Sequence, residues 1–269
     1  MSLLELPNEN ASLAIIGGTG VYDPKLFQDS KEIKVFTPYG TTSPFLSIGL
    51  HGSRKIAFLP RHGQDHSIPP HKINYRANIY ALKQLGVERI ISVSSVGSLR
   101  EELKPGDFVF PDQFIDRTKN RADTFFEGGQ VVHVSSADPF CPQIRRIFKD
   151  SAQKLEINSH SGGTYICIEG PRFSTRSESK LFRLWGADIV GMTLYPEAIL
   201  ALEARICYAS ICMVTDFDVW VEKPVSAKEV SETLRKNIES AKRLILSAID
   251  NLPNERSCAC SDALSGAVL

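Results

Sequence analysis

The sequence predicts an α/β protein, a single domain in which a central mixed β-sheet is flanked by helices on both faces. Short apolar segments typical of buried strands alternate with longer segments typical of helices. A length of 269 residues suits one large domain with a full core, and no internal repeat or interdomain linker divides the chain. We therefore expect one domain over residues 1–269, ending in a flexible, cysteine-containing tail from about residue 252.

Glycine, proline and serine mark the ends of the predicted elements. The expected strands cover residues 14–16, 55–59, 89–94, 165–168, 188–191 and 208–215, with a further strand beginning at residue 108. The expected helices cover residues 74–85, 141–155, 174–185, 196–205 and 226–249. Asn74 is the expected N-cap of the first helix, and the run from Ser226 to Glu229 has the pattern of a capping box for the last.

Charge and composition exclude several functional classes. Lys plus Arg equals Asp plus Glu, 31 against 31, so no overall field attracts nucleic acid or an acidic membrane. No apolar run approaches the ~20 residues that a membrane-spanning helix needs. The first six residues include an acidic residue and no basic one, unlike a signal peptide. We expect a cytoplasmic protein that binds neither nucleic acid nor membranes.

The six cysteines allow two interpretations. In the first, Cys141, Cys167, Cys207 and Cys212 are buried thiols and the Cys258–Cys260 pair is mobile, as is usual in the cytosol. In the second, some of them form structural disulfides, as in intracellular proteins of hyperthermophiles. The Cys258-Ala259-Cys260 spacing is tighter than that of a usual zinc knuckle.

Candidate functional residues follow the predicted strands. In open α/β sheets, ligands bind beyond the carboxyl ends of the strands, so residues at these positions converge on one pocket. The positions that we expect to converge in this way are Thr19, Arg61, Ser94, Glu169, Met192 and Asp216.

Two of these positions have the chemistry of an anion site. The Gly17–Gly20 loop lacks the dinucleotide fingerprint, because Asp23 occupies the place of its last small residue. Its glycines would instead let backbone amides and the Thr19 hydroxyl approach an anion; a plain strand-to-loop turn is the alternative, which the loop alone favours. Arg61 adds a planar donor pair that suits phosphate, and His62 a titratable imidazole; a surface arginine beside a half-buried histidine is the alternative.

A metal site is not expected among the histidines. His62, His66 and His71 lie within ten residues of one another, but no cysteine or acidic residue has matching spacing. Pro69 and Pro70 prevent one helical face from presenting all three imidazoles.

Two further motifs suit recognition of a purine. Phe173 offers an aromatic face for stacking, although a core position would suit it as well. Asp216 and Asp218 end a strand, where a carboxylic acid can protonate the leaving base of a nucleoside. Helix capping or a cation site is the alternative for this pair.

Taken in order, these motifs resemble the trimeric purine nucleoside phosphorylase family over roughly residues 12 to 250, in particular its archaeal members that cleave 5'-methylthioadenosine. The motifs that carry the resemblance are Gly17–Gly20, Arg61–Gly63, Ser94–Ser98, Glu169–Glu178, Gly191–Thr193 and Thr215–Asp218. The resemblance implies phosphorolysis of 5'-methylthioadenosine to adenine and 5-methylthioribose-1-phosphate, with inorganic phosphate as co-substrate and no metal or organic cofactor.

The resemblance also assigns roles. It makes Asp216 the acid that protonates N7 of the base and Asp218 the acceptor for the 6-amino group. It places Phe173 under the base, Met192 against the ribose, and His66 and Val230 near the 5' substituent. Its phosphate ligands are Thr19, Arg61, His62, Ser94, Ser95 and Thr193.

The resemblance also bears on selectivity, on assembly and on the alternative function. Ala227, Val230 and Ser231 are smaller or more polar than the family's apolar 5' pocket, which weakens the expectation of strict methylthio selectivity. His133 matches a histidine that the family supplies from a neighbouring subunit, so a homo-oligomer, a trimer or a dimer of trimers, is expected. A 6-oxopurine nucleoside phosphorylase, or a nucleoside-binding protein without turnover, is the alternative function.

Overall fold

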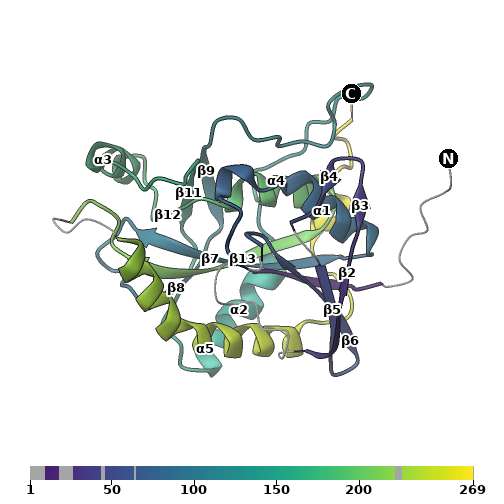
Figure 1. Ribbon diagram of the computed structural model, residues 1–269, viewed down its shortest axis with the longest axis horizontal. Helices are drawn as coiled ribbons and strands as arrows, with labels where there is room; N and C mark the ends of the chain where they lie inside the picture. Colours follow the sequence, from purple (N-terminus) through teal and green to yellow (C-terminus); the bar gives the residue numbers. More distant parts are fainter. Residues whose placement is uncertain (1–9, 18–26, 44–45, 64, 222–225, 269) are drawn as a thin grey trace.

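The computed structural model describes residues 10–17, 27–43, 46–63, 65–221 and 226–268. Within these residues, one large sheet of eleven strands forms the centre of the molecule (Figure 1). Its strands are β1 (Leu13–Gly17), β2 (Gln28–Ile33), β5 (Leu46–His51), β6 (Arg54–Pro60), β7 (Arg89–Ser98), β8 (Phe108–Phe110), β9 (Gln113–Arg117), β10 (Ser159–Ser161), β11 (Thr164–Ile168), β12 (Ile189–Gly191) and β13 (Cys207–Asp216). Strands β3 (Phe36–Thr37) and β4 (Gly40–Thr41) pair separately.

The sheet is mixed, as the sequence predicted. Its main path runs β10-β8-β13-β7-β1-β6-β5-β2, and the central strands β13, β7, β1 and β6 are parallel. The flanking pairs β8–β13 and β5–β6 are antiparallel. The carboxyl end of β7 also pairs antiparallel with β12, and β12 in turn pairs with β11. This branch places β12 beside the carboxyl ends of the central strands β7 and β13, where the candidate residues lie.

Helices cover both faces of the sheet, so the predicted fold class is confirmed (Figure 1). The helices are α1 (Tyr75–Gln84), α2 (Pro142–Lys154), α3 (Arg176–Leu184), α4 (Leu194–Glu203) and α5 (Ala227–Asn251), with single turns η2 (Pro70–Lys72) and η3 (Ala259–Asp262). Helices α1 and α4 pack on one face and α2 and α5 on the other.

Strand β1 shows why the central strands are apolar throughout. Its residues Ala14 and Ile16 face the core beneath α1 and α4, whereas Leu13 and Ile15 face the core beneath α2 and α5. Because successive side chains of a strand point to opposite faces, a strand covered on both faces must be apolar at every position.

Several predicted boundaries agree with the structure. The Asn74 side chain accepts a hydrogen bond from the Ala77 amide at 3.1 Å and caps α1. The regular part of α4 begins at Pro196, because Tyr195 before it has non-helical backbone angles. Helix α5 begins at Ala227, but the side chain of Glu229 lies outside the described residues, so the predicted capping box stays a prediction.

Other features differ from the expectations. Helix α3 begins at Arg176 rather than at Ser174, because Thr175 and Glu178 form a capping box that fixes its start. Strands β2, β5, β9 and β10 were not predicted. Strand β2 is largely exposed, so its sequence lacks the alternating apolar pattern by which a half-buried strand is recognised.

The C-terminal segment packs against the body instead of forming the loose tail that we expected. Leu252 is buried in the core, and its carbonyl accepts a hydrogen bond from Arg54 Nη2 at 2.9 Å. Further on, the His133 amide donates to the Ala267 carbonyl at 2.8 Å, and Val268 forms a β-bridge with Val132. No helix of the described residues is long and apolar enough to cross a membrane.

Candidate active site

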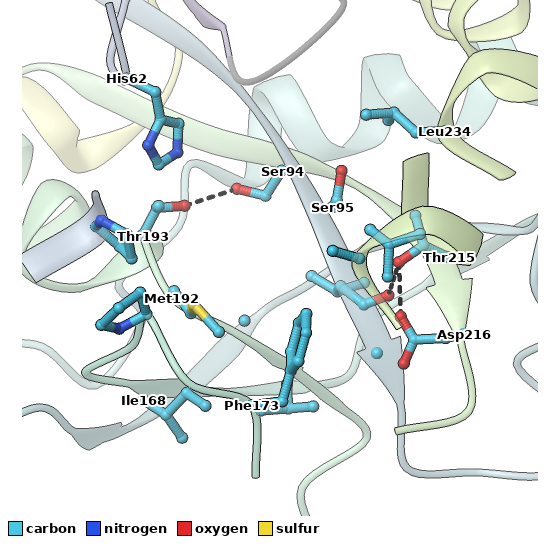
Figure 2. Close-up of a pocket in the computed structure, with 18 of the residues that line it drawn as sticks. His62, Ser94, Ser95, Ile168, Phe173, Met192, Thr193, Thr215, Asp216 and Leu234 are labelled. Atoms are coloured by element: carbon cyan, nitrogen blue, oxygen red, sulfur yellow. Dashed lines mark hydrogen bonds between the residues drawn. The ribbon is translucent and has the colours of Figure 1, made fainter. Parts of the chain in front are cut away.

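A pocket of about 600 Å³ lies at the carboxyl ends of β6, β7, β12 and β13 (Figure 2). Nearly all of the predicted site residues that the structure describes line it, namely Arg61, His62, His66, Ser94, Ser95, Phe173, Met192, Thr193, Asp216, Asp218 and Val230. Thr19 lies outside the described residues. The strand before it ends at the pocket, because the Gly17 carbonyl accepts a hydrogen bond from the Arg61 amide at 3.2 Å.

Two hydroxyls form the first part of the candidate phosphate site. Ser94 Oγ on β7 lies 3.1 Å from Thr193 Oγ1, and both side chains are buried. The Thr193 amide donates to the Tyr165 hydroxyl at 3.4 Å, which fixes the residue at the start of α4. In Figure 2, Ser94, Thr193 and His62 lie at one end of the pocket, whereas Phe173 and Asp216 lie at the other.

Arg61 is fully buried and is bound mainly by the protein itself. Its Nε and Nη2 donate to the two carboxylate oxygens of Glu197 at 2.9 and 2.7 Å. Nη2 also donates to Ser92 Oγ, and Nη1 donates to the Val93 carbonyl at 2.9 Å. The guanidinium nitrogens that we expected to bind phosphate therefore donate to Glu197 instead. One hydrogen on Nη1 remains for a ligand.

His62 is a neutral imidazole in this site. Its Nδ1 lies 2.9 Å from the Ile68 carbonyl, so Nδ1 carries the hydrogen and Nε2 is an acceptor. Burial, followed by the charge of Arg61, lowers the pKa of His62 to about 3. Its ring packs against that of His66, at 4.3 Å between centroids, and burial also lowers the pKa of His66.

The two aspartates lie at the opposite end of the pocket. Asp216 Oδ1 accepts a hydrogen bond from the Asp218 amide at 2.8 Å. The Thr215 hydroxyl has one hydrogen but two acceptors in reach, Asp216 Oδ2 at 2.8 Å and the Val96 carbonyl at 3.2 Å. When this hydroxyl donates to Val96, its oxygen can accept a hydrogen bond from a protonated Asp216, so the site accommodates both protonation states of this carboxyl group.

Asp218 is held in an unusual environment. Its backbone has a positive φ of 48°, which turns the side chain into the pocket wall, and burial raises its pKa. The Ser179 hydroxyl, the Val219 amide and the Ser174 hydroxyl oppose this shift. Neither hydroxyl forms a hydrogen bond of normal geometry, however, and Asp218 Oδ2 is a buried acceptor without a partner. Such an atom needs a donor, which a ligand can supply.

A glycine makes room for this aspartate pair. A Cβ atom at Gly97 would lie 2.9 Å from Asp216 Oδ1 and 3.3 Å from Asp218 Cβ. Any larger residue there would displace the carboxylates, so the glycine in the Ser94–Ser98 motif is explained by a close approach rather than by a turn.

Apolar side chains line the rest of the pocket. Phe173 is 39% exposed and faces the pocket, so it is free for stacking and is not a core residue. Val230 contributes from α5, and Leu234 follows it one turn later on the same side. Leu234 was not predicted, although residues four apart share a helix face and Val230 was a candidate. Its side chain makes the α5 side of the pocket more apolar than Ala227, Val230 and Ser231 suggested.

His133 does not line the pocket of its own chain. It is exposed, in the long connection between β9 and α2, and its backbone pairs with the C-terminal segment. Its expected place in a neighbouring subunit's site stays a prediction. Glu197 was not among the predicted residues, because its role depends on contacts with Arg61 that no local motif reveals.

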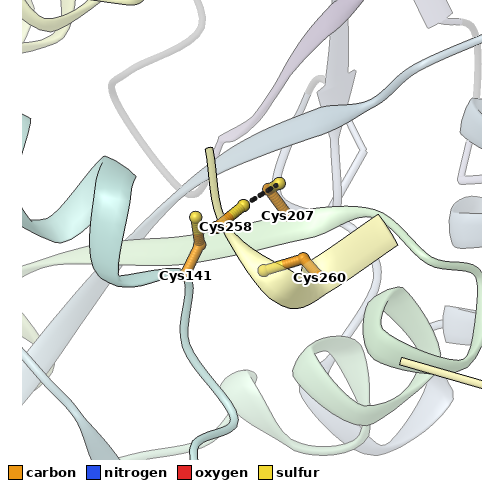
Figure 3. Close-up of side chains that lie close together, drawn as sticks. All are labelled: Cys141, Cys207, Cys258 and Cys260. Carbon is orange, nitrogen blue, oxygen red and sulfur yellow. Dashed lines mark hydrogen bonds between the residues drawn. The ribbon is translucent and has the colours of Figure 1, made fainter. Parts of the chain in front are cut away.

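Four cysteines lie together away from this pocket, a grouping that the sequence did not indicate (Figure 3). Cys141 precedes α2, Cys207 begins β13, and Cys258 and Cys260 come from the C-terminal segment. All four sulfur atoms lie within 4.8 Å of one another, and Cys207 and Cys258 are 3.3 Å apart. All six cysteines are free thiols, so the disulfide bonds of the second interpretation are not observed.

Comparison with known proteins agrees with this geometry. The sequence profile of the phosphorylase superfamily matches residues 12–250. The chain belongs to the phosphorylase superfamily. Among the relatives of this phosphorylase, the S-methyl-5'-thioadenosine phosphorylase of Thermofilum pendens is 59% identical over 261 residues, which cover 97% of this chain and 100% of the relative. That of Saccharolobus solfataricus is 58% identical over 266 residues, covering 97% and 98%.

Solved phosphorylase structures have the same fold. A methylthioadenosine phosphorylase sourced from an antarctic soil metagenomic library superimposes with a TM-score of 0.92 at 46% identity, covering 97% of this chain and 93% of that one. A mutant adenosine/methylthioadenosine phosphorylase from Schistosoma mansoni, in complex with methylthioadenosine, gives a TM-score of 0.90 at 40% identity, with 96% of each chain covered.

Proposed function

We propose that this phosphorylase cleaves 5'-methylthioadenosine with inorganic phosphate and releases adenine and 5-methylthioribose-1-phosphate. The observation that carries the proposal is one pocket with the candidate phosphate ligands Ser94, Thr193 and His62 at one end and the Asp216–Asp218 pair at the other. Relatives that are 53–59% identical over nearly the whole chain are methylthioadenosine phosphorylases by name, which supports the same substrate here.

The phosphate end of the pocket provides hydrogen-bond donors but little net positive charge. Arg61 and Glu197 form a neutral pair, and His62 is uncharged, so Ser94 and Thr193 bind phosphate mainly through hydrogen bonds. Because His62 Nε2 is an acceptor, it would accept a hydrogen bond from the P–OH group of hydrogen phosphate, and an anionic oxygen of the same phosphate would attack C1'. Ser95 and Thr19 complete this proposed phosphate site.

The base end supports departure of adenine. As the C1'–N9 bond breaks, its electron pair moves onto the purine, and a proton from Asp216 to N7 neutralises the base. The unpartnered Asp218 Oδ2 would accept a hydrogen bond from the 6-amino group of adenine. A 6-oxopurine would instead present an oxygen to this carboxylate, which disfavours inosine and guanosine.

The sugar lies between the two ends. Phe173 would stack on the base and the Met192 backbone would bind a ribose hydroxyl, which holds C1' near the phosphate. Val230 and Leu234 give the 5' end an apolar wall that suits a methylthio group, with His66 beside it. In this proposal the chemistry needs positioning and charge stabilisation, and neither a metal nor an organic cofactor.

Turnover of 5'-methylthioadenosine with and without phosphate tests this function. Adenine release should require phosphate and should produce 5-methylthioribose-1-phosphate in equal amount. Equal release in phosphate-free buffer would identify a hydrolase, and binding without release would identify a nucleoside-binding protein.

The proposal extends to assembly and location. We expect a trimer or a dimer of trimers, in which His133 completes a neighbouring subunit's site, and a cytoplasmic location.

The proposal also extends to the chemistry of the cysteine cluster. We expect an oxidant such as oxidised glutathione to convert Cys141, Cys207, Cys258 and Cys260 to disulfides, because their sulfur atoms are already close.

A further inference from the structure

Arg121 lies outside the pocket, yet it contacts the two loops that form its walls. The first is the base loop, residues 168–175, which follows β11 and carries Phe173. The second is the ribose loop, residues 192–195, which follows β12 and carries Met192 and Thr193. The Arg121 side chain is only 3% exposed and does not reach the pocket itself.

One guanidinium group binds both loops through backbone oxygens. On the ribose loop, Arg121 Nη1 donates to the carbonyls of Met192 at 2.9 Å and Tyr195 at 2.5 Å. On the base loop, Nη2 donates to the carbonyl of Glu169 at 2.8 Å, with Ile168 more distant at 3.4 Å. Because the group is planar and rigid, these bonds fix the separation of the two loops.

Two further observations show that this separation is tightly set. A Cβ atom at Gly170 would lie 2.6 Å from Met192 Sδ and 2.7 Å from Pro70 Cγ, so the loops already meet as closely as the backbone permits. Arg121 Nη1 also lies 3.2 Å from the Tyr75 hydroxyl, which donates to the Pro70 carbonyl at 3.0 Å. Pro70 lines a third side of the same pocket.

We infer that Arg121 is a positioning residue that holds the base loop and the ribose loop at a fixed spacing, so that a bound nucleoside keeps its base over Phe173 while its ribose lies at Met192. This inference rests on the proposed function. A nucleoside spans both loops, whereas free adenine contacts the base loop alone. Loss of Arg121 should therefore weaken use of the nucleoside much more than binding of the base.

Arg121→Met and Arg121→Lys test the inference, because neither side chain can donate in a plane to both loops. We expect kcat/KM for 5'-methylthioadenosine to fall ~10²-fold, the size of effect that a displacement of about 1 Å produces. The KM for phosphate should change far less, because Ser94 and Tyr165 still hold Thr193. The Kd for adenine, measured by calorimetry, should stay within a factor of about three.

A matched control separates positioning from general stability. Arg89 is equally buried, at 3% exposed, and donates to the Asn254 carbonyl at the far end of β7. Arg89→Met should lower the melting temperature but leave kcat/KM unchanged. In Arg121→Ala, added guanidinium should restore part of kcat, whereas methylammonium should not, because only the planar ion can bond both loops.

Three results would overturn the inference. They are full kcat/KM in Arg121→Met, an adenine Kd that weakens as much as nucleoside use, and an equal loss of activity in Arg89→Met. Wild-type protein that fails to cleave 5'-methylthioadenosine would refute the proposed function instead, and the Kd values of adenine and nucleoside in the variants would still report on the spacing of the loops.

Discussion

At the scale of single residues, the pocket assigns different tasks to chemically similar groups. Asp216 lies within hydrogen-bond distance of the Asp218 amide and the Thr215 hydroxyl, whereas Asp218 is buried with one unpartnered oxygen. The guanidinium of Arg61 is bound mainly by the Glu197 carboxylate. That of Arg121 lies 3.5 Å from Glu169 Oε1 but donates mainly to backbone carbonyls. The environment of each residue, rather than its type, determines what it can offer a substrate.

The Asp216→Asn variant tests the choice of base. An amide cannot protonate N7 as an acid, but it can donate a hydrogen bond and tolerates an oxygen at C6. We expect kcat/KM for 5'-methylthioadenosine to fall by the ~10²–10⁴-fold typical of losing a general acid, with a relative gain for inosine. Asp218→Ala should loosen the preference for a 6-amino group with a smaller loss of kcat. Measuring kcat/KM for both nucleosides in each variant checks this, and an unchanged ratio in Asp216→Asn would contradict it.

The depressed pKa of His62 predicts how stability depends on pH. The folded protein keeps this imidazole neutral down to about pH 3, whereas the unfolded chain binds its proton near pH 6.5. The unfolded state therefore binds more protons between these values, and stability falls as the pH falls. At pH 5 this linkage amounts to about 2 kcal/mol relative to pH 7.

Denaturant titrations of wild type and His62→Asn at pH 7 and pH 5 measure that effect. They must be made at one protein concentration, because assembly also contributes to stability. Wild type should lose more stability than the variant on acidification. Equal losses in the two proteins would show that His62 is not held neutral by the fold.

At the scale of elements, the C-terminal segment is held by side-chain contacts and a few backbone hydrogen bonds rather than by a long helix or strand. Its cysteines meet Cys141 and Cys207 beside α2 and β13, and its last residues pair with the connection that carries His133. The cysteine cluster therefore links the core to the segment that supports His133, although the pocket lies elsewhere.

Oxidation of this cluster should raise the melting temperature. Each disulfide formed is worth ~2–4 kcal/mol, mainly because it restricts the unfolded chain. After treatment with oxidised glutathione, thiol titration of the denatured protein should find fewer than six free groups, and peptide mapping should identify the pairs. Cys167 and Cys212, which lie outside the cluster, should stay reduced. Six free thiols would contradict the expectation, and release of zinc by a chelator would identify a tetrathiolate metal site instead.

At the scale of the whole molecule, we propose that another subunit contributes His133 to the site. The described pocket includes residues from several strands and α5, but His133 lies on the surface beside the C-terminal segment. Exposed Val131 and Val268 flank it and give this region an apolar surface that suits burial between subunits.

Mixed oligomers of His133→Ala and Asp216→Ala subunits test this arrangement. Neither variant alone forms a complete site if His133 acts across an interface. A random mixture should regain about a quarter of the wild-type sites, where an intact pocket adjoins an intact His133. Co-expression with two purification tags provides the mixture, and kcat/KM per site measures recovery. No recovery, with weak activity in His133→Ala alone, would contradict a role across the interface. Full activity in His133→Ala alone would remove His133 from catalysis.

The sequence by itself determined the order along the chain of the central strands and of the helices. It also determined the capping of α1 and the positions where a pocket would form. These features depend on local patterns: apolar runs, turn residues and polar residues that follow strands. For the same reason, nearly all of the predicted site residues that the structure describes line one pocket.

Only the tertiary structure decided which partners these residues have. Glu197 neutralises Arg61 from 136 positions away in the sequence, and Arg121 joins two loops that are distant in sequence from it and from each other. The packed C-terminal segment and the four-cysteine cluster likewise depend on contacts between remote elements. Such contacts arise from how the elements pack in three dimensions, and no local pattern in a single sequence encodes them.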